Sequence, residues 1–193
     1  MLERKNMRTM VSILILGVAA AACGSKTATD TQSLNPKMVE RGKYLVTLAS
    51  CNDCHTPWKL GPKGPEPDMT RMLSGHPQEF PMPPATASSG PWAWSGAVTN
   101  TAFAGPWGVS YAFNLTPDKN TGIGIWTEDI FINTIRNGRH WGVARPILPP
   151  MPWQNIREMT DEDLRAVFAY LRSIPPVNNK VPDAVIASEQ ATD

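Results

Sequence analysis

Two cysteines and a histidine fall within five positions in the stretch "SCNDCHTP", which runs from Ser50 to Pro57. The whole chain has three cysteines and three histidines, so this cluster gathers residue types that are rare elsewhere in the sequence. Cysteines three positions apart lie on one side of a helical turn, and the next residue can turn its ring toward the same side. Thiols and an imidazole in this arrangement suit a redox dithiol, a metal site, a disulfide or the covalent attachment of a haem.

The spacing Cys-x-x-Cys-His favours haem attachment over the other chemistries. In c-type haem proteins both thiols bond to the haem vinyl groups and the adjacent histidine binds the iron. No β-branched strand run precedes Cys51, as a thioredoxin-like dithiol would require, and only His76 and His140 remain as further zinc ligands. A disulfide between residues three apart has poor geometry. We therefore predict one covalent haem c, bound through Cys51 and Cys54, with His55 as the proximal ligand.

A haem iron held in this way usually has a second axial ligand, and two methionines stand in similar proline-rich loops. Met151 lies in "ILPPMPW" and Met82 in "FPMPPA". Prolines restrict the backbone, so a thioether there can be held at the iron at little entropic cost. Met151 is favoured because an amphipathic helix with a core to cover follows it. His140 lies near Met151 in sequence, and it has three interpretations: a surface residue, a hydrogen-bond donor behind a ligand, or the sixth ligand itself.

Two amphipathic segments are expected to position these residues. The first opens at Asn35, just before a proline, and the second opens at Thr160 and stops before a proline. Gly42 leaves room for the two helices to cross closely, with Tyr170 or Leu171 as the partner. Apolar or small residues recur every three to four positions in each segment: Met38, Gly42, Leu45, Val46 and Ala49 in the first, and Leu164, Val167, Phe168, Leu171 and Ile174 in the second.

This combination resembles the mono-haem class I cytochromes c from about Pro36 to Pro176. More narrowly, the stretches "NLTPDKNTGIGIWTEDIFINTIRNGRH", "ILPPMPW" and "MTDEDLRAVFAYLRSIPP" are similar to the cytochrome domains of multi-haem dehydrogenase subunits. The resemblance implies an all-α, cytochrome c-like fold with a long Pro/Gly/Trp-rich insert between the haem motif and the middle helix. It also implies that Met151 is the distal axial ligand. Three further residues are implied as contacts that pack against the haem or hydrogen-bond its propionates: Trp126, Asn114 and Arg139.

Two of these implied contacts have a purely structural alternative. Trp126 precedes Thr127, which can cap a helix, so the indole can serve as a hydrophobic staple into the core. Arg136 and Arg139 lie near the end of that helix at Gly138, where cations are favourable in any protein.

The insert, at about residues 58–113, is longer than a minimal cytochrome c requires. The chain has 14 glycines and 19 prolines, which predict much ordered loop and turn. The sequence has one Cys-x-x-Cys-His motif, so the insert is not a second haem domain. Its aromatic content favours packing over disorder, with a short hairpin lying over an edge of the haem. Its aromatic residues include Trp58, Trp92, Trp94, Trp107 and Phe113.

The N-terminal segment is typical of an export signal. Basic residues precede the apolar run "MVSILILGVAAAA", which ends in small residues before Cys23. The ending "AAACGS" resembles a bacterial lipoprotein cleavage site and implies lipidation of Cys23. An ordinary signal peptide, an uncleaved anchor and a bystander cysteine are the alternatives. We expect a signal peptide at 1–22, a flexible tether at 23–35, a cytochrome c domain at 36–177 and a C-terminal tail at 178–193.

A haem whose axial positions are filled by histidine and methionine has no open position for a substrate, which predicts an electron carrier rather than an enzyme. We expect a periplasmic, membrane-anchored cytochrome that passes single electrons between a dehydrogenase and a terminal oxidase or reductase. A fixed subunit of a dehydrogenase complex would use the same chemistry. The alternative is a haem enzyme or ligand sensor with a displaceable sixth ligand, such as a peroxidase-like protein. The formal net charge of +1 becomes −1 without the leader's three basic residues and one acidic residue, so nothing indicates a nucleic-acid partner.

Overall fold

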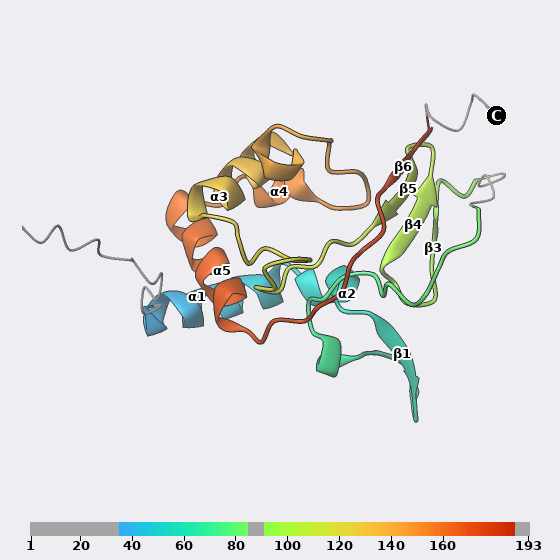
Figure 1. The fold of residues 1–193 in the computed structure, drawn as a ribbon, viewed down its shortest axis with the longest axis horizontal. Helices are drawn as coiled ribbons and strands as arrows, with labels where there is room; N and C mark the ends of the chain where they lie inside the picture. The colour runs from blue at the N-terminus through green and yellow to red at the C-terminus, as the bar shows by residue number, and fades with distance from the viewer. Residues whose placement is uncertain (1–34, 85–90, 188–193) are drawn as a thin grey trace, which may run out of the picture. The chain divides into compact units, whose positions relative to one another are not determined.

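The structure is a computed structural model that describes residues 35–84 and 91–187 (Figure 1). The chain divides into two units, Met1–Gln32 and Ser33–Asp193, and all described elements belong to the second. Its helices are α1 (Pro36–Leu48), α2 (Cys51–His55), α3 (Glu128–Asn137), α4 (Trp153–Ile156) and α5 (Asp161–Ser173), with 3₁₀ turns η1 (Met69–Arg71) and η2 (His140–Gly142). Its strands are β1 (Trp58–Gly61), β2 (Gly64–Pro67), β3 (Ser95–Gly96), β4 (Ala102–Gly105), β5 (Gly108–Tyr111) and β6 (Val185–Ile186).

Helices α1 and α5 pack against each other, and local signals explain where each begins. The Asn35 side chain accepts a hydrogen bond from a first-turn backbone N–H at 3.0 Å. The Thr160 hydroxyl likewise accepts from the backbone N–H of Asp163 at 3.1 Å. A Cβ at Gly42 would lie 2.8 Å from Cβ of Tyr170 and would also collide with a carbonyl of α5. The predicted close crossing at Gly42 is therefore confirmed.

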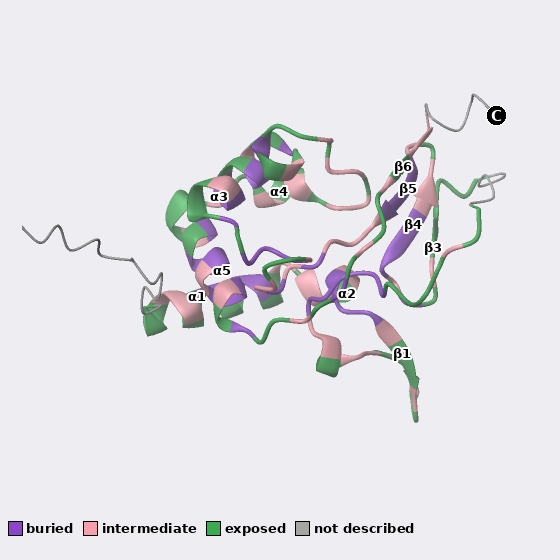
Figure 2. Cartoon of the chain, in the orientation of Figure 1, coloured by how far each residue is buried: buried purple, intermediate pink, exposed green. Residues whose placement is uncertain are grey.

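Helix α3 completes the helical part of the core. The Thr127 hydroxyl accepts from the N–H of Ile130 at 3.2 Å, and the helix ends at Gly138, whose φ of 62° lies in the left-handed region. Figure 2 shows buried residues on α1, α3 and α5 and along β4 and β5. The apolar stripe predicted for α5 is confirmed, because all of its members are buried: Leu164, Val167, Phe168, Leu171 and Ile174.

The expected all-α fold is wrong, because the insert contains five short β-strands. Strands β1 and β2 form one antiparallel pair, and β3, β4, β5 and β6 form a four-stranded antiparallel sheet in that order. The first five strands lie within residues 58–113, and β6 follows α5. The structure therefore has a mixed helix and sheet content.

Two hairpin turns of the insert, β1–β2 and β4–β5, have the sequence Gly-Pro-x-Gly, "GPKG" at 61–64 and "GPWG" at 105–108. Proline suits the second position of a type I turn, and glycine suits the fourth. The final glycine has a positive φ in both turns, 118° at Gly64 and 103° at Gly108. The glycines and prolines that indicated loops therefore also mark turns between short strands.

The segment after α5 is tied to the insert over much of its length. In Figure 1 it runs from α5 past α2 to β6. Asn179 is fully buried, and its Nδ2 donates to the carbonyl oxygens of Ser74 at 2.7 Å and His76 at 2.8 Å. Its Oδ1 accepts from the N–H of Gln78 at 2.9 Å and from Nη2 of Arg71 at 3.3 Å. One side chain thus links residues that are about one hundred positions apart.

Candidate functional site

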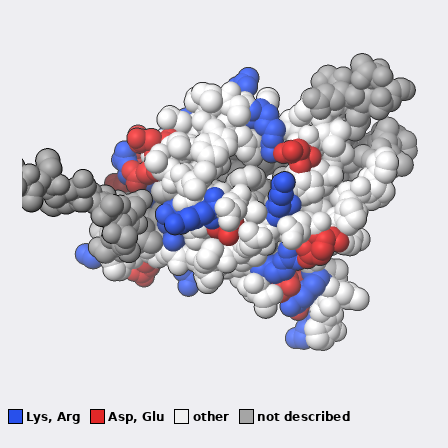
Figure 3. Space-filling view, in the orientation of Figure 1, with Lys and Arg blue, Asp and Glu red and all other residues white. Residues whose placement is uncertain are grey.

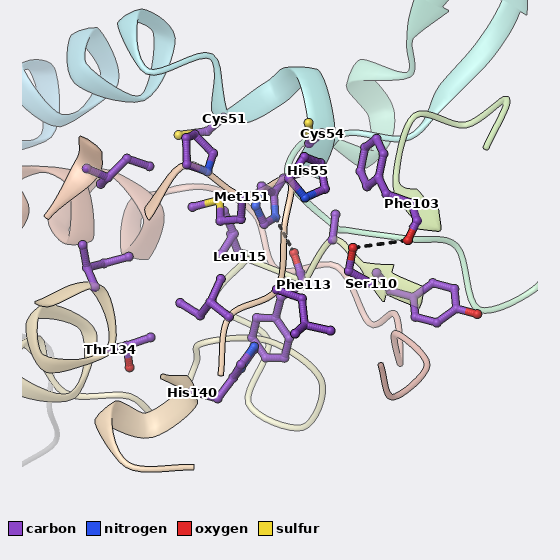
Figure 4. A pocket seen from close by; sticks show the side chains of 18 of the residues that line it. Cys51, Cys54, His55, Phe103, Ser110, Phe113, Leu115, Thr134, His140 and Met151 are labelled. Atoms are coloured by element: carbon purple, nitrogen blue, oxygen red, sulfur yellow. Dashed lines mark hydrogen bonds between the residues drawn. The ribbon is translucent and has the colours of Figure 1, made fainter. Parts of the chain in front are cut away.

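A cavity of about 430 Å³ lies among α2, β4, β5, α3 and the loop before α4 (Figure 4). This volume lies within the range of roughly 300–1,000 Å³ that is usual for ligand and cofactor sites, and most of the wall is apolar. The wall side chains that carry chemistry come from distant parts of the sequence: Cys51, Cys54, His55, Trp126, His140, Arg145 and Met151.

The two cysteines of α2 are both free and both partly buried at this cavity. Burial raises the pKa of the Cys51 thiol to about 11. Burial also raises the pKa of Cys54, and the charge of Asp53 acts in the same direction. Both thiols are therefore protonated at neutral pH, whereas a dithiol nucleophile needs a lowered pKa. These environments disfavour the thioredoxin-like interpretation of the motif.

His55 has the tautomer and the environment of a metal-binding imidazole. Its side chain is buried, and its Nδ1 lies 2.7 Å from the carbonyl oxygen of Phe113 (Figure 4). A carbonyl can only accept, so Nδ1 carries the proton and Nε2 keeps a free lone pair. Burial lowers the pKa of His55, which keeps the ring neutral. A backbone acceptor on one ring nitrogen is the usual partner of a histidine that binds metal through the other.

Met151 lines the same cavity, whereas Met82, in the other proline-rich loop, is not among its wall residues. The Met151 loop is held at two points. The Ser110 hydroxyl donates to the carbonyl oxygen of Pro149 at 2.6 Å, and the N–H of Ile147 donates to a carbonyl at the end of α3 at 2.8 Å. Figure 4 shows Met151 among the same group of side chains as His55 and the cysteines.

Trp126 lies at the cavity wall, as a haem-packing residue would. Its ring is stacked on Phe113, with centroids 5.9 Å apart, and lies 5.2 Å from the ring of Trp141. It is also 7% exposed and belongs to the main apolar core. Trp126 can therefore be both a hydrophobic staple into the core and a residue of the cavity wall.

Asn114 and Arg139 are not among the residues of the cavity wall. Asn114 is fully buried, and its Nδ2 donates to the carbonyl oxygen of Val177 at 2.8 Å. Its Oδ1 accepts from the N–H of Thr116 at 3.0 Å. Nη1 of Arg139 donates to the carbonyl oxygen of Ala144 at 2.9 Å. In the structure both side chains hydrogen-bond to backbone groups of the protein.

His140 and Arg145 also lie at the wall, and no sequence pattern had singled out the arginine. Burial lowers the pKa of His140 to about 4, helped by the positive charge of Arg145, so its ring is neutral. The ring packs edge-on against Phe113 with centroids 5.4 Å apart. The surface interpretation of His140 therefore does not fit its position. Arg145 follows no recognisable motif, so only the fold reveals it.

The wall residues fit a covalently attached haem. Two protonated thiols, a neutral imidazole with a free nitrogen and a thioether meet at one apolar cavity. Within residues 35–84 and 91–187, no group of three or more His, Cys, Asp or Glu side chains is placed to hold a metal ion. The donor set therefore favours an iron porphyrin over a bare ion.

Cys23 and the predicted leader lie outside the described residues. Among the described helices, none has the length and apolar content needed to cross a membrane.

No protein-family model matches the sequence. Curated relatives do match. The chain is 27% identical over 184 residues to the gluconate 2-dehydrogenase cytochrome c subunit of Pantoea cypripedii, covering 93% of this chain and 32% of that protein. It is 26% identical over 174 residues to the fructose dehydrogenase cytochrome subunit of Gluconobacter japonicus, covering 90% of this chain and 29% of that protein.

A third relative is the cytochrome c subunit of the quinone alcohol dehydrogenase of Gluconobacter oxydans. It is 27% identical over 171 residues, which cover 87% of this chain and 28% of that protein. The chain thus spans about a third of the length of these relatives. Similarity to dehydrogenase cytochrome c subunits supports the presence of a cytochrome c domain in this chain.

Proposed function

We propose that this protein is a c-type cytochrome that carries single electrons through one haem. Cys51 and Cys54 would hold the haem covalently, and His55 and Met151 would be its axial ligands. The observation that carries the proposal is the convergence of these side chains on one apolar cavity, with the imidazole fixed by Phe113 in its ligand form. When bound, the haem supplies a one-electron iron couple. The protein side chains would hold it, exclude water from it and supply both axial ligands.

We propose a dehydrogenase as the electron donor and a terminal oxidase or reductase as the acceptor. The donor is supported by relatives that are named as cytochrome subunits of dehydrogenases. Trp94 supports direct contact with a partner, because it lines the cavity and is still 44% exposed. Basic and acidic side chains are mixed on the face drawn in Figure 3. Such a surface suits a small, transient interface with weak electrostatic steering.

We further propose that the chain is exported and anchored to a membrane from the periplasmic side. The basis is the sequence of residues 1–22, which has the layout of a signal peptide, followed by Cys23 in a lipoprotein-type context. Residues 23–35 would then be a tether for a domain that begins near Pro36.

The test is to export the full chain in a host with cytochrome c maturation machinery and to measure covalent haem. We expect one haem per chain, which remains attached after denaturation in acid and solvent. Cys51→Ser and Cys54→Ser should each abolish stable attachment and leave poorly folded protein, because cofactor binding and folding are coupled in small metalloproteins. Either variant with full covalent haem would overturn the assignment. A wild-type ferrous or ferric iron that binds added carbon monoxide or cyanide immediately would instead favour a ligand sensor or haem enzyme.

A further inference from the structure

Arg145 is a positive charge in the wall of the apolar cavity. Its side chain is half-buried. Within the described part of the chain it forms no ion pair. Its hydrogen bond, from Nη1 to the carbonyl oxygen of Pro146, is long at 3.5 Å. Burial lowers the pKa of Arg145, and the charge of Asp183 opposes this only in part. The guanidinium is thus partly desolvated without an anion that compensates for it.

The loop that carries Arg145 is fixed on both sides. The N–H of Ile147 donates to the carbonyl oxygen of Gly138 at 2.8 Å and closes the base of the loop. The N–H of His140 donates to the carbonyl oxygen of Arg145 at 3.0 Å. Across the same loop, Arg139 donates to a backbone carbonyl at 2.9 Å. Arg139 therefore positions the loop, and Arg145 is the arginine that faces the cavity.

We propose that Arg145 binds a carboxylate of the group that occupies the cavity. The inference rests on the proposed function, under which that carboxylate is a haem propionate. Among the described wall residues, Arg145 is the only lysine or arginine. A guanidinium can form two parallel hydrogen bonds with one carboxylate, an arrangement that a single ammonium cannot reproduce.

Such a contact has an electronic consequence. A carboxylate whose charge is not compensated favours the oxidised, more positive form of a nearby iron, and the effect is strong in a medium of low dielectric constant. Pairing with Arg145 removes part of this bias. Loss of the guanidinium should therefore lower the midpoint reduction potential.

The experiment compares Arg145→Gln and Arg145→Lys with Arg165→Gln in the purified, haem-loaded protein. Arg165→Gln is a matched control, because it removes the same charge from a residue that pairs with Glu128 at 2.8 Å on the exposed side of the helices. Redox titration and the propionate-bending bands of the resonance Raman spectrum are measured. We expect Arg145→Gln to lower the potential and shift these bands. Arg145→Lys should lower the midpoint potential less than Arg145→Gln does, and it should still shift the propionate bands. Arg165→Gln should match wild type.

Different results separate this inference from the proposed function. If wild type carries covalent haem and Arg145→Gln matches Arg165→Gln in both measurements, Arg145 has no such role and the cytochrome assignment stands. If Arg145→Gln does not accumulate with haem, Arg145→Lys decides, and propionate bands identical to wild type overturn the inference. Wild-type protein without covalent haem overturns both.

Discussion

Met151 lies in a loop that is held at the cavity by hydrogen bonds to residues far away in the sequence. Met82 is also flanked by prolines, yet it is not among the wall residues. The Met151 loop is held by the hydrogen bond from Ser110 to the carbonyl of Pro149 and by the closure of the loop base at Ile147. Tertiary contacts of the loop, rather than its prolines, therefore single out Met151 as the proposed ligand.

Met151→Ala should abolish the long-wavelength absorption band of the ferric methionine-ligated haem, and Met82→Ala should leave it unchanged. Loss of the thioether should also lower the midpoint potential, because methionine ligation favours the ferrous state. Optical spectra and redox titration of the two purified variants provide the measurement. Retention of the band in Met151→Ala would exclude Met151. A low-spin spectrum without that band would point to His140 as a replacement ligand.

His76 should make the stability of the protein depend on pH below neutrality. Its ring is fully buried, with Nε2 donating to the carbonyl oxygen of Phe80 at 2.8 Å. Nδ1 must then accept from the Thr101 hydroxyl at 2.9 Å. Burial lowers the pKa of His76 in the folded state. Because the unfolded chain has a histidine pKa of about 6.5, it binds protons first as the pH falls, and folding is then weakened.

The free energy of unfolding should therefore be steady above about pH 6.5 and fall as the pH is lowered toward the folded pKa of His76. His76→Gln removes this titration, so its curve should be flatter than that of wild type over the same interval. Denaturant titrations of both haem-loaded proteins at a series of pH values test this. Parallel curves for the two proteins would show that His76 does not titrate differently in the two states.

The grouping of residues within one turn follows from the sequence alone, whereas the contacts of residues that depend on the fold follow from it only in part. Cys51, Cys54 and His55 are neighbours in sequence, so α2 alone brings them together. Asn114 and Arg139 were assigned to the haem by resemblance, but their partners are backbone carbonyls set by the tertiary structure. No local sequence pattern distinguishes a side chain that hydrogen-bonds to the backbone from one that lines the cavity.

At the scale of elements, helices with strong end signals were predictable and short strands were not. α1, α3 and α5 each begin at a capping side chain and bury an apolar stripe. The strands are two to four residues long, too short for an alternating pattern to emerge. The repeated Gly-Pro-x-Gly sequence was the signal that could have located the β1–β2 and β4–β5 hairpins. The pairing of β6 with β5 joins distant parts of the sequence, so no local sequence pattern predicts it.

Asn179 should be essential for holding the segment after α5. Asn179→Ala removes four hydrogen bonds and leaves the carbonyls of Ser74 and His76 and the N–H of Gln78 without their partner. An unsatisfied buried group costs about 1–3 kcal/mol, so we expect a loss of about 3 kcal/mol in the free energy of unfolding. Asn178→Ala, at the exposed neighbour, is the control and should stay close to wild type. Equal denaturation midpoints for the two variants would contradict this role.

At the scale of the whole molecule, we propose two different modifications, haem attachment and lipidation, which fall on different cysteines. Cys51 and Cys54 belong to α2, whereas Cys23 precedes the described residues. The near-neutral charge of the chain gives little electrostatic attraction to a membrane surface. Acyl chains contribute roughly 0.8 kcal/mol per buried methylene group, so lipid on Cys23 would decide whether the protein stays at the membrane.

Cys23→Ser should therefore release the protein from the membrane fraction while leaving its haem in place. We expect wild type to be extracted by detergent but not by salt, and its mature mass to include one haem and the diacylglycerol modification of the first cysteine. The variant should be recovered in the soluble periplasmic fraction with the haem mass unchanged. Cys51→Ser is the reciprocal control, because it should lose haem and keep the lipid. Wild-type protein that is soluble and unlipidated would reject the anchor without affecting the cytochrome assignment, since the two modifications are read as independent masses on one chain.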